Sequence, residues 1–486
     1  MQSPKRPSSI AGALVVVLAV GVVTAVATLG SGEVEDRPSS YRARALADTL
    51  RKGSDRDPRN FIVVGDQMFF SAHSDRHGYE LWKSDGTRRG TVEVKDINPG
   101  QYHSSPLGVA LGDVYVFAAR DGAHGDEIWR SDGTEGGTVM IKDIAHRESS
   151  DPAGFVVAGG LVFFTADDLV HGEELWVTDG STRGTRLVEE IDRRKPPTTE
   201  YQDPPRELTA VGEVVYFSAN DGLHGRELWT SDGTRRGTRM VKEIDPRRGS
   251  STFRHQPTAL VAVGDTLYFS ADDSVHGHEL WRSDGTAAGT MMVTDIASGP
   301  RGSKIAFPVA VGGTLFFSAD DRVHGVEPWI SDGTPEGTLL ANDIAHGSES
   351  SIPWNPVLGD GVAFFTAHDD DKRAQLWRSD GTIGGTMLIA RFDSDTPCGM
   401  QPAAAIGGLV FLQGCTLWES DGTETGTVKV AAEGADRAEP SYEFGVLGDT
   451  LLFNNYTMSG HGDSTLWVAT PIRVSGTAGS SAAPSR

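Results

Sequence analysis

Six histidines recur in one local setting, and their side chains are the first candidates for metal chemistry. Each stands five residues before a tryptophan and is followed by glycine: His77, His124, His171, His224, His276 and His324. In three copies a pair of aspartates closely precedes the histidine, which gives nine candidate metal ligands: Asp167, Asp168, His171, Asp272, Asp273, His276, Asp320, Asp321 and His324. Carboxylates suit calcium whereas imidazole suits transition metals, so the mixture fits neither ion well. The pattern favours Asx turns in which the histidine bonds to a neighbouring repeat; calcium is the alternative, and no cofactor is firmly implied.

Six glutamates stand two residues before the same tryptophans, on one face of the expected strand: Glu80, Glu127, Glu174, Glu227, Glu279 and Glu327. Paired carboxylates can act as general acid and base, but six equivalent glutamates cannot all be catalytic. We expect them instead to accept hydrogen bonds between neighbouring repeats. The chain has no His-Glu-x-x-His, Gly-x-Ser-x-Gly or phosphate-loop motif, so we assign no catalytic residue. A non-enzymatic role is favoured, and enzyme activity stays open.

Nine tryptophans mark the unit that must position these side chains. Each follows Leu, Ile or Pro, at intervals of 41 to 53 residues: Trp82, Trp129, Trp176, Trp229, Trp281, Trp329, Trp377, Trp418 and Trp467. Eight of the nine continue into Asp-Gly-Thr or Asp-Gly-Ser three residues on. An aspartate that accepts backbone N–H bonds, followed by a glycine with positive φ, is typical of a tight hairpin. We therefore expect the tryptophans in the core and the Asp-Gly-Thr segments in turns.

Each unit contains four short apolar segments separated by turn residues. In the first unit these are residues 61–64, 67–71, 80–83 and 91–97. Four strands per unit without helices predict an all-β fold, a β-propeller of four-stranded blades, because the common alternatives need helices or much shorter periods. A β-solenoid is the alternative fold. The count is nine blades, with eight as the alternative because the unit around Trp418 is short.

The two ends of the repeat region complement each other. Residues Leu46–Leu50 resemble an isolated fourth strand, while the last unit has its first three strands, ending near Trp467, and lacks the fourth. Together they would form one complete sheet. Because open sheet edges are avoided in native proteins, we expect an N-terminal strand to close the ring.

The repeated residues resemble the bacterial ELWxxDGT repeat family, whose signature reads here as Glu80-Leu-Trp-Lys-Ser-Asp-Gly-Thr87. The resemblance covers about residues 41–471. It implies a secreted or surface-attached, propeller-like protein and no settled activity. Four units depart from the signature, at Pro328, Gln375, Thr416 and Thr465.

The N-terminus has the features of a signal peptide over residues 1–27. Two basic residues precede the apolar stretch 10–24, and Ala25-Val26-Ala27 then supplies the small residues that cleavage requires. An uncleaved membrane anchor is the alternative, since roughly 20 apolar residues span a bilayer. Either way, the protein is predicted to be secreted or held at the outer cell surface. The remaining divisions are a linker over 28–40, the repeats over 41–471 and a disordered tail over 472–486, rich in Ser, Ala and Gly.

Charge and cysteine content limit the partners. The net charge of −23 disfavours nucleic acid through repulsion from phosphates. A membrane is expected as a partner only if the N-terminal segment is uncleaved. The two cysteines, Cys398 and Cys415, are predicted to form a disulfide, as is common in exported proteins.

Variation between the copies points to a binding surface. The spacing varies largely after the fourth strand, and the two long connections carry basic and aromatic candidate binding residues: Arg193, Arg194, Tyr201, Arg247, Arg248, Phe253 and Arg254. Insertions concentrated on one face of a repeat protein commonly mark its binding face. We therefore expect an extracellular binding module for a glycan or a protein. A propeller hydrolase or lyase acting on polysaccharide and a calcium-stabilised surface scaffold are the alternatives.

Overall fold

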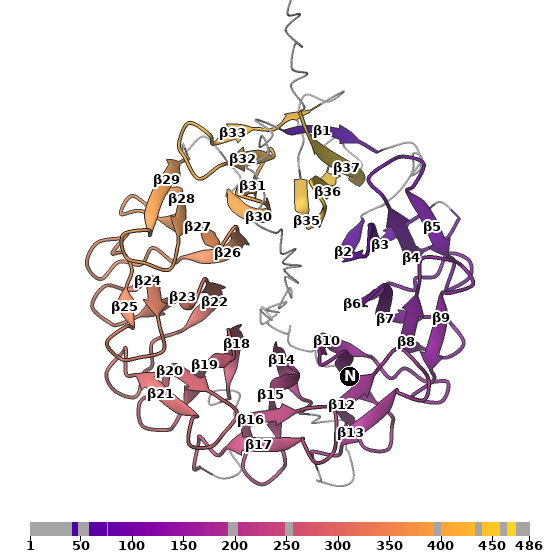
Figure 1. The fold of residues 1–486 in the computed structure, drawn as a ribbon, viewed down its shortest axis with the longest axis horizontal. Coiled ribbons are helices and arrows are strands. Elements are labelled where there is room, and N and C mark those ends of the chain that lie inside the picture. The colour runs from indigo at the N-terminus through magenta and orange to yellow at the C-terminus, as the bar shows by residue number, and fades with distance from the viewer. Residues whose placement is uncertain are drawn as a thin grey trace, which may run out of the picture. The chain divides into compact units, whose positions relative to one another are not determined.

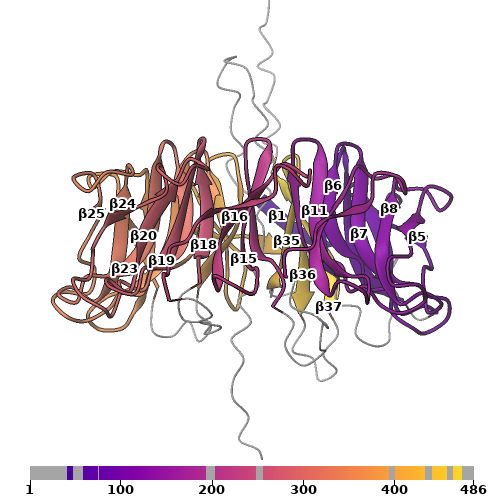
Figure 2. The same cartoon turned by 90° about the horizontal axis from the view of Figure 1, so that it is seen from below.

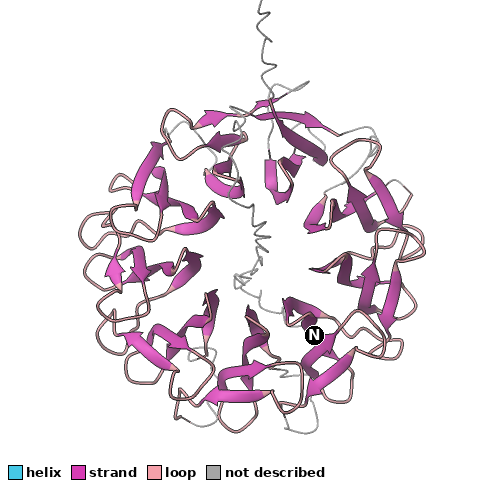
Figure 3. Cartoon of the chain, viewed as in Figure 1, coloured by secondary structure: helices cyan, strands magenta, loops and turns pink. Residues whose placement is uncertain are grey.

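Nine antiparallel sheets form the protein, as seen in a computed structural model (Figure 1). The structure describes residues 41–46, 58–74, 76–192, 203–247, 256–392, 400–432, 440–456 and 464–472. Over these residues every regular element is a strand (Figure 3). They all belong to one unit, in which the sheets follow one another around a ring as the blades of a propeller. This confirms the predicted fold and the count of nine blades.

Blades one to eight are four-stranded meanders. We number blades one to eight in chain order from the sheet β2 to β5, and blade nine contains both ends of the ring. The first strands line the centre in Figure 1: β2 (Arg59–Val64), β6 (Leu107–Leu111), β10 (Ala153–Ala158), β14 (Arg206–Val211), β18 (Thr258–Val263), β22 (Ala306–Val311), β26 (Trp354–Gly359), β30 (Gln401–Ile406) and β35 (Pro440–Leu447). The second strands follow: β3 (Gln67–His73), β7 (Val114–Arg120), β11 (Leu161–Asp167), β15 (Val214–Asn220), β19 (Thr266–Asp272), β23 (Thr314–Asp320), β27 (Val362–His368), β31 (Leu409–Gln413) and β36 (Thr450–Tyr456).

The third strands carry the repeated tryptophans: β4 (Tyr79–Ser84), β8 (Asp126–Ser131), β12 (Glu173–Thr178), β16 (Arg226–Ser231), β20 (His278–Ser283), β24 (Val326–Ser331), β28 (Ala374–Ser379), β32 (Trp418–Ser420) and β37 (Ser464–Pro471). The fourth strands lie at the rim: β5 (Val92–Lys95), β9 (Val139–Lys142), β13 (Arg186–Glu189), β17 (Arg239–Lys242), β21 (Met291–Thr294), β25 (Leu339–Leu340), β29 (Met387–Arg391), β33 (Val428–Lys429) and β1 (Tyr41–Ala45). Because successive strands alternate in direction, the loops gather on two opposite faces of the ring (Figure 2).

An N-terminal strand closes the ring, as predicted, but its position was predicted wrongly. The strand is β1, which pairs antiparallel with β37 from Tyr41 opposite Pro471 to Ala45 opposite Trp467. Residues 47–50 of the expected strand lie outside the described residues. The alternation of residues 41–44 explains the difference, since Tyr41 and Ala43 are buried while Arg42 and Arg44 are exposed, as a half-buried strand requires. A short segment, β34 (Ala431–Ala432), adds a fifth strand by pairing parallel with β1.

The hydrophobic core lies between the blades. The second strands are apolar on both faces because each is covered on both sides. In the boundary between blades one and two, for example, Phe69 and Leu81 pack against Tyr115, Phe117 and Trp129. Six of the nine repeated tryptophans are buried as predicted, at Trp82, Trp129, Trp176, Trp281, Trp377 and Trp467. The other three, Trp229, Trp329 and Trp418, are partly exposed.

Several predicted segments fall on residues that the structure does not describe. The signal peptide (1–27), the linker (28–40) and residues 473–486 of the tail are among them. Cys398 is another, so its disulfide with Cys415 stays a prediction. Among the described residues, no helix is both long and apolar enough to cross a membrane.

Candidate functional site

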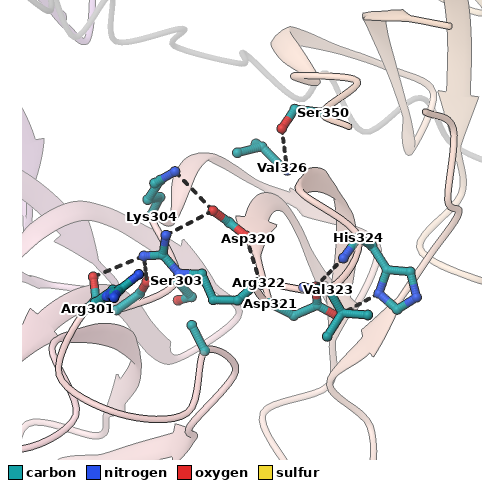
Figure 4. A network of polar contacts seen from close by, with 12 residues as sticks. Arg301, Ser303, Lys304, Asp320, Asp321, Arg322, Val323, His324, Val326 and Ser350 are labelled. Atoms are coloured by element: carbon teal, nitrogen blue, oxygen red, sulfur yellow. Dashed lines mark hydrogen bonds and ion pairs between the residues drawn. The ribbon is translucent and has the colours of Figure 1, made fainter. Parts of the chain in front are cut away.

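Five of the six repeated histidines form a closed pair with an aspartate of their own loop. The loop joins the second and third strands, and the His Nδ1 lies 2.7 or 2.8 Å from the Oδ2 of the aspartate three residues earlier. The histidine backbone N–H also donates to that aspartate, as Figure 4 shows for Asp321 and His324. This Asx turn was predicted, but the partner is in the same loop and not in a neighbouring blade. The aspartate raises the pKa of His124, His276 and His324 by holding the imidazole with a hydrogen bond.

In three of the five pairs another aspartate stands directly before the paired one and has a second structural role. Asp167, Asp272 and Asp320 each accept the backbone N–H of the residue two positions on. Asp320 also accepts a bond of 2.9 Å from the Lys304 ammonium, and Arg322 lies beside it (Figure 4). Within the described part of the chain, no three His, Cys, Asp or Glu side chains are grouped so that they could hold a metal ion. The candidate ligands therefore contact one another only as single Asp–His pairs, which are parts of turns.

The six repeated glutamates are buried and accept hydrogen bonds from the backbone that follows the fourth strand. Glu227 is 1 % exposed, and its carboxylate accepts the backbone N–H groups of Ile244 and Asp245 at 2.8 and 3.1 Å. The corresponding glutamates of the other five blades accept equivalent bonds. Hydrogen bonding was predicted, but these donors belong to the same blade and to the connection that leaves it. Burial raises the pKa of Glu80 and Glu279 to about 7 and that of Glu174 and Glu227 to about 8.

The Asp-Gly-Thr segments are hairpin turns, as predicted. In blade five the Asp284 carboxylate accepts the backbone N–H and the hydroxyl of Thr286 at 2.8 and 2.7 Å. Gly285 between them has a φ of 85°, which favours glycine. The same bonds recur in the turns of blades one to eight. The Asp-Gly-Thr motif therefore stabilises a hairpin turn of each of these blades.

A lysine that the sequence reasoning missed joins neighbouring blades at the rim. Lys142 at the end of β9 donates to the carbonyl of Thr185 in the next blade at 2.9 Å, and its ammonium lies 5.6 Å from the ring centre of Trp176. Lys242 makes the same contact at the boundary between blades four and five. It donates to the carbonyl of Thr290 at 2.6 Å and lies over Trp281. Lys95 donates to the corresponding carbonyl of blade two. We call this contact the lysine bridge.

The lysine bridge is absent at the boundary between blades three and four. The strand register places Glu189 of β13 where the other fourth strands have Lys142 and Lys242. A pocket of about 550 Å³ lies at this boundary, and Glu189, Trp229 and Thr238 are in its wall. The rest of its lining is Glu190, Ile191, Asp221, Gly222, Leu223, Arg235, Arg239 and Met240.

Where a lysine bridge crosses a boundary, the tryptophan of the next blade is buried. Under a bridging lysine, Trp129, Trp176 and Trp281 are only 5 or 6 % exposed. Trp229, which faces Glu189, and Trp329, which faces Thr294, are partly exposed. At these two boundaries the tryptophan is partly exposed where no lysine bridge covers it, whereas Trp82, Trp377 and Trp467 are buried by other contacts.

The predicted binding residues lie next to this pocket in the sequence, and the structure describes one of them. Arg247 donates to the Asp245 carboxylate at 2.9 Å. The other six, Arg193, Arg194, Tyr201, Arg248, Phe253 and Arg254, lie outside the described residues. The two long connections start from β13 and β17, which contribute to the pocket together with Trp229 of β16. The long connections thus follow strands that contribute to the pocket.

Comparison with known proteins finds only distant structural matches. No family model matches the chain, and no curated protein does, so the ELWxxDGT resemblance stays a prediction from the sequence. Among solved structures, a prolyl endopeptidase is 13 % identical with a TM-score of 0.42, over 74 % of this chain and 55 % of that one. A puromycin hydrolase is 15 % identical with a TM-score of 0.38, over 86 % and 61 %. BamB from Moraxella catarrhalis is 15 % identical with a TM-score of 0.37, over 87 % and 95 %. This chain thus spans less than two thirds of the first two.

Proposed function

We propose that this protein is an exported binding module that recognises a protein or glycan partner at the boundary between blades three and four. The observation that carries the proposal is the pocket of about 550 Å³, which lies where Glu189 replaces the bridging lysine of the repeat. A concave site with an aromatic wall and a few polar groups is the usual form of a binding site.

The repeated polar residues support a binding role over catalysis. The buried glutamates hold backbone N–H groups, the aspartates hold turns, and five of the histidines are paired within their own loops. These groups serve the scaffold in blade after blade, as expected of a repeat protein. What differs between the blades is left to recognise a partner, and the predicted binding residues follow β13 and β17 in the sequence.

A pair of matched variants tests the location of the site. Leu223 lines the pocket and is 69 % exposed, while Val275 stands at the same position of the next blade and is 62 % exposed. Both sit at loop tips, so substitution by arginine leaves the core intact. The full chain is first screened against an array of acidic and neutral polysaccharides and peptides, and each ligand found is then measured against both variants.

We expect Leu223→Arg to weaken binding and Val275→Arg to leave it unchanged. Equal binding by both variants would place the site elsewhere. Release of new reducing ends from a polysaccharide, at a rate that scales with protein concentration, would replace the binding role with a hydrolytic one.

A further inference from the structure

A buried serine joins neighbouring blades in the connections that follow blades one, two and five. In the connection from β5 to β6, the backbone N–H of Ser104 donates to the Tyr79 carbonyl of β4 at 2.9 Å. The Ser104 carbonyl accepts the backbone N–H of Arg120 in blade two at 3.1 Å. Ser150 and Ser303 make both bonds at their own boundaries. Because these serines are at most 1 % exposed, each connection is fixed to two blades at this point.

The residue before such a serine can give the connection a second bond to the same blade. Ser149 does this after blade two and Ser350 after blade six, where their hydroxyls accept the first backbone N–H of the third strand at 3.0 and 2.9 Å (Figure 4 shows Ser350). After blade one the acceptor is His103, whose Nδ1 accepts the backbone N–H of Tyr79 at 3.0 Å. The three donors are equivalent, since each stands three residues before a repeated tryptophan. At this boundary a titratable ring therefore takes the place of a hydroxyl.

The bond to Tyr79 requires one protonation state of His103. A backbone N–H can be accepted only by an unprotonated ring nitrogen, so the bond exists only while Nδ1 carries no proton. Imidazole gains its second proton between about pH 5 and pH 8, and both ring nitrogens are then donors. A flip of the charged ring therefore cannot restore the bond. A serine hydroxyl, in contrast, accepts equally well across this range of pH.

The titratable and charged side chains around His103 do not favour its charged form. Its ring centre lies 6.0 Å from that of His73 at the end of β3 and 5.3 Å from that of Tyr79 in β4. Arg59 of β2 lies on the same tyrosine, with its guanidinium carbon 4.1 Å from the ring centre. Among the described residues, these contacts of His103 and of its tyrosine partner include no carboxylate. A proton on His103 thus adds positive charge beside a second imidazole and near a guanidinium.

The connection lies directly on the backbone before β4. A Cβ built on Gly78 would lie 1.8 Å from the carbonyl oxygen of Tyr102 and 2.6 Å from Nδ1 of His103. The approach is possible because Gly78 has no side chain. Two donors that face each other at this separation repel, and the connection must move away from β4 to part them.

We propose that residues 98–106 form a pH-sensitive switch at the boundary between blades one and two, in which protonation of His103 releases the connection from β4. The neutral ring holds the connection against the third strand, and in acid the bonds of the following serines remain as its attachment. The connections and the loops between second and third strands lie on one face of the ring, because both precede strands that run in the same direction. The switch therefore lies on the face that carries Leu223 of the pocket. This inference does not depend on the proposed binding function.

Hydrogen exchange of the full chain tests the switch. Peptides that contain Tyr79 and Ser104 are followed by mass spectrometry at about pH 5 and about pH 8, and each rate is divided by the intrinsic rate at that pH. We expect the Tyr79 amide to be about two- to tenfold less protected at the lower pH, as the loss of one hydrogen bond predicts. His103→Ser supplies the hydroxyl found at other boundaries and should give equal protection at both pH values.

Two further variants serve as controls. Ser149→His transfers the ring to the boundary between blades two and three and should make the exchange of the Asp126 amide depend on pH. Gly78→Ala forces the connection away from β4 at every pH and shows that the measurement detects release.

Equal protection of the Tyr79 amide at both pH values in the native chain would overturn the inference. A pH dependence that His103→Ser leaves unchanged would also overturn it, because another group would then be responsible. Neither result bears on the proposed binding site, which the Leu223→Arg variant tests separately.

Discussion

Replacing one buried glutamate by glutamine should make the protein more stable in alkaline solution, and Glu227 is the best position for the test. Burial raises the pKa of Glu227 to about 8 from its ordinary 4.5. A raised pKa means that the folded protein holds the proton more tightly than the unfolded chain. Glu227 therefore contributes its full stability below about pH 4.5 and loses it progressively as the pH rises through about 8.

The size of the effect follows from that difference in pKa. One pKa unit corresponds to about 1.4 kcal/mol, so ionising Glu227 costs the folded state about 5 kcal/mol once the pH exceeds about 8. Glutamine does not ionise, but its amide nitrogen cannot accept the second backbone N–H that the carboxylate accepts. We expect Glu227→Gln to be less stable than the native protein near about pH 5 by about 1–3 kcal/mol, and to exceed it near about pH 9 by about 2–4 kcal/mol because only the native side chain ionises.

The assay is the free energy of unfolding from urea titrations between about pH 5 and pH 9. The chain contains its own precedent in Gln375, whose amide oxygen accepts the Trp377 indole N–H at 3.0 Å and whose amide nitrogen donates to Asp369 at 2.8 Å. The reverse change, Gln375→Glu, should add a new loss of stability with rising pH. If Glu227→Gln were less stable than the native protein by the same amount at every pH, the carboxylate would be needed as an ionised acceptor and the reasoning would fail.

Two further predictions concern the scaffold. Trp281→Ala should destabilise the protein by about 3–5 kcal/mol, and Trp229→Ala by less, because Trp281 is buried under a lysine bridge while Trp229 is partly exposed; equal losses in urea unfolding would contradict the difference in cover. Asp273→Asn should lower the pKa of His276, because the aspartate hydrogen bond is the main cause of its elevation, and an NMR titration in which that pKa stayed raised would show that another group holds the proton.

Much of the fold could be predicted because the repeat leaves a regular mark on the sequence. The spacing of tryptophan and Asp-Gly-Thr fixes the third strand and the hairpin after it, and both were placed correctly. The closing strand was misplaced because residues 46–50 were likened to a fourth strand, whereas the strand that closes the ring is β1, Tyr41–Ala45. The buried and exposed alternation of residues 41–44 was the better signal.

The candidate site was harder to predict because it depends on contacts between blades. Lys142 and Trp176 are 34 positions apart, and nothing local in the sequence links them. A signal was nevertheless present in the alignment of the fourth strands, which end in Lys95, Lys142, Glu189 and Lys242 in turn. Reading that column would have marked Glu189 as an acid among lysines, although the next fourth strand ends in Thr294. That the exception opens a pocket follows only from the packing of one blade on the next.

The closing blade also determines how the ring would respond to a pulling force. In the register of β1 and β37, Tyr41 lies opposite Pro471, so both ends of the described chain leave from the same end of the strand pair. A load applied between them would open the hydrogen bonds one after another, as in a zipper, and would not shear all of them together. Tyr41 also donates its backbone N–H to Glu419 of blade eight at 3.0 Å, and that bond would be among the first to carry the load. The pairing of β1 with β37 therefore closes the ring at equilibrium but has little mechanical strength. Single-molecule stretching should open the ring at this strand pair first.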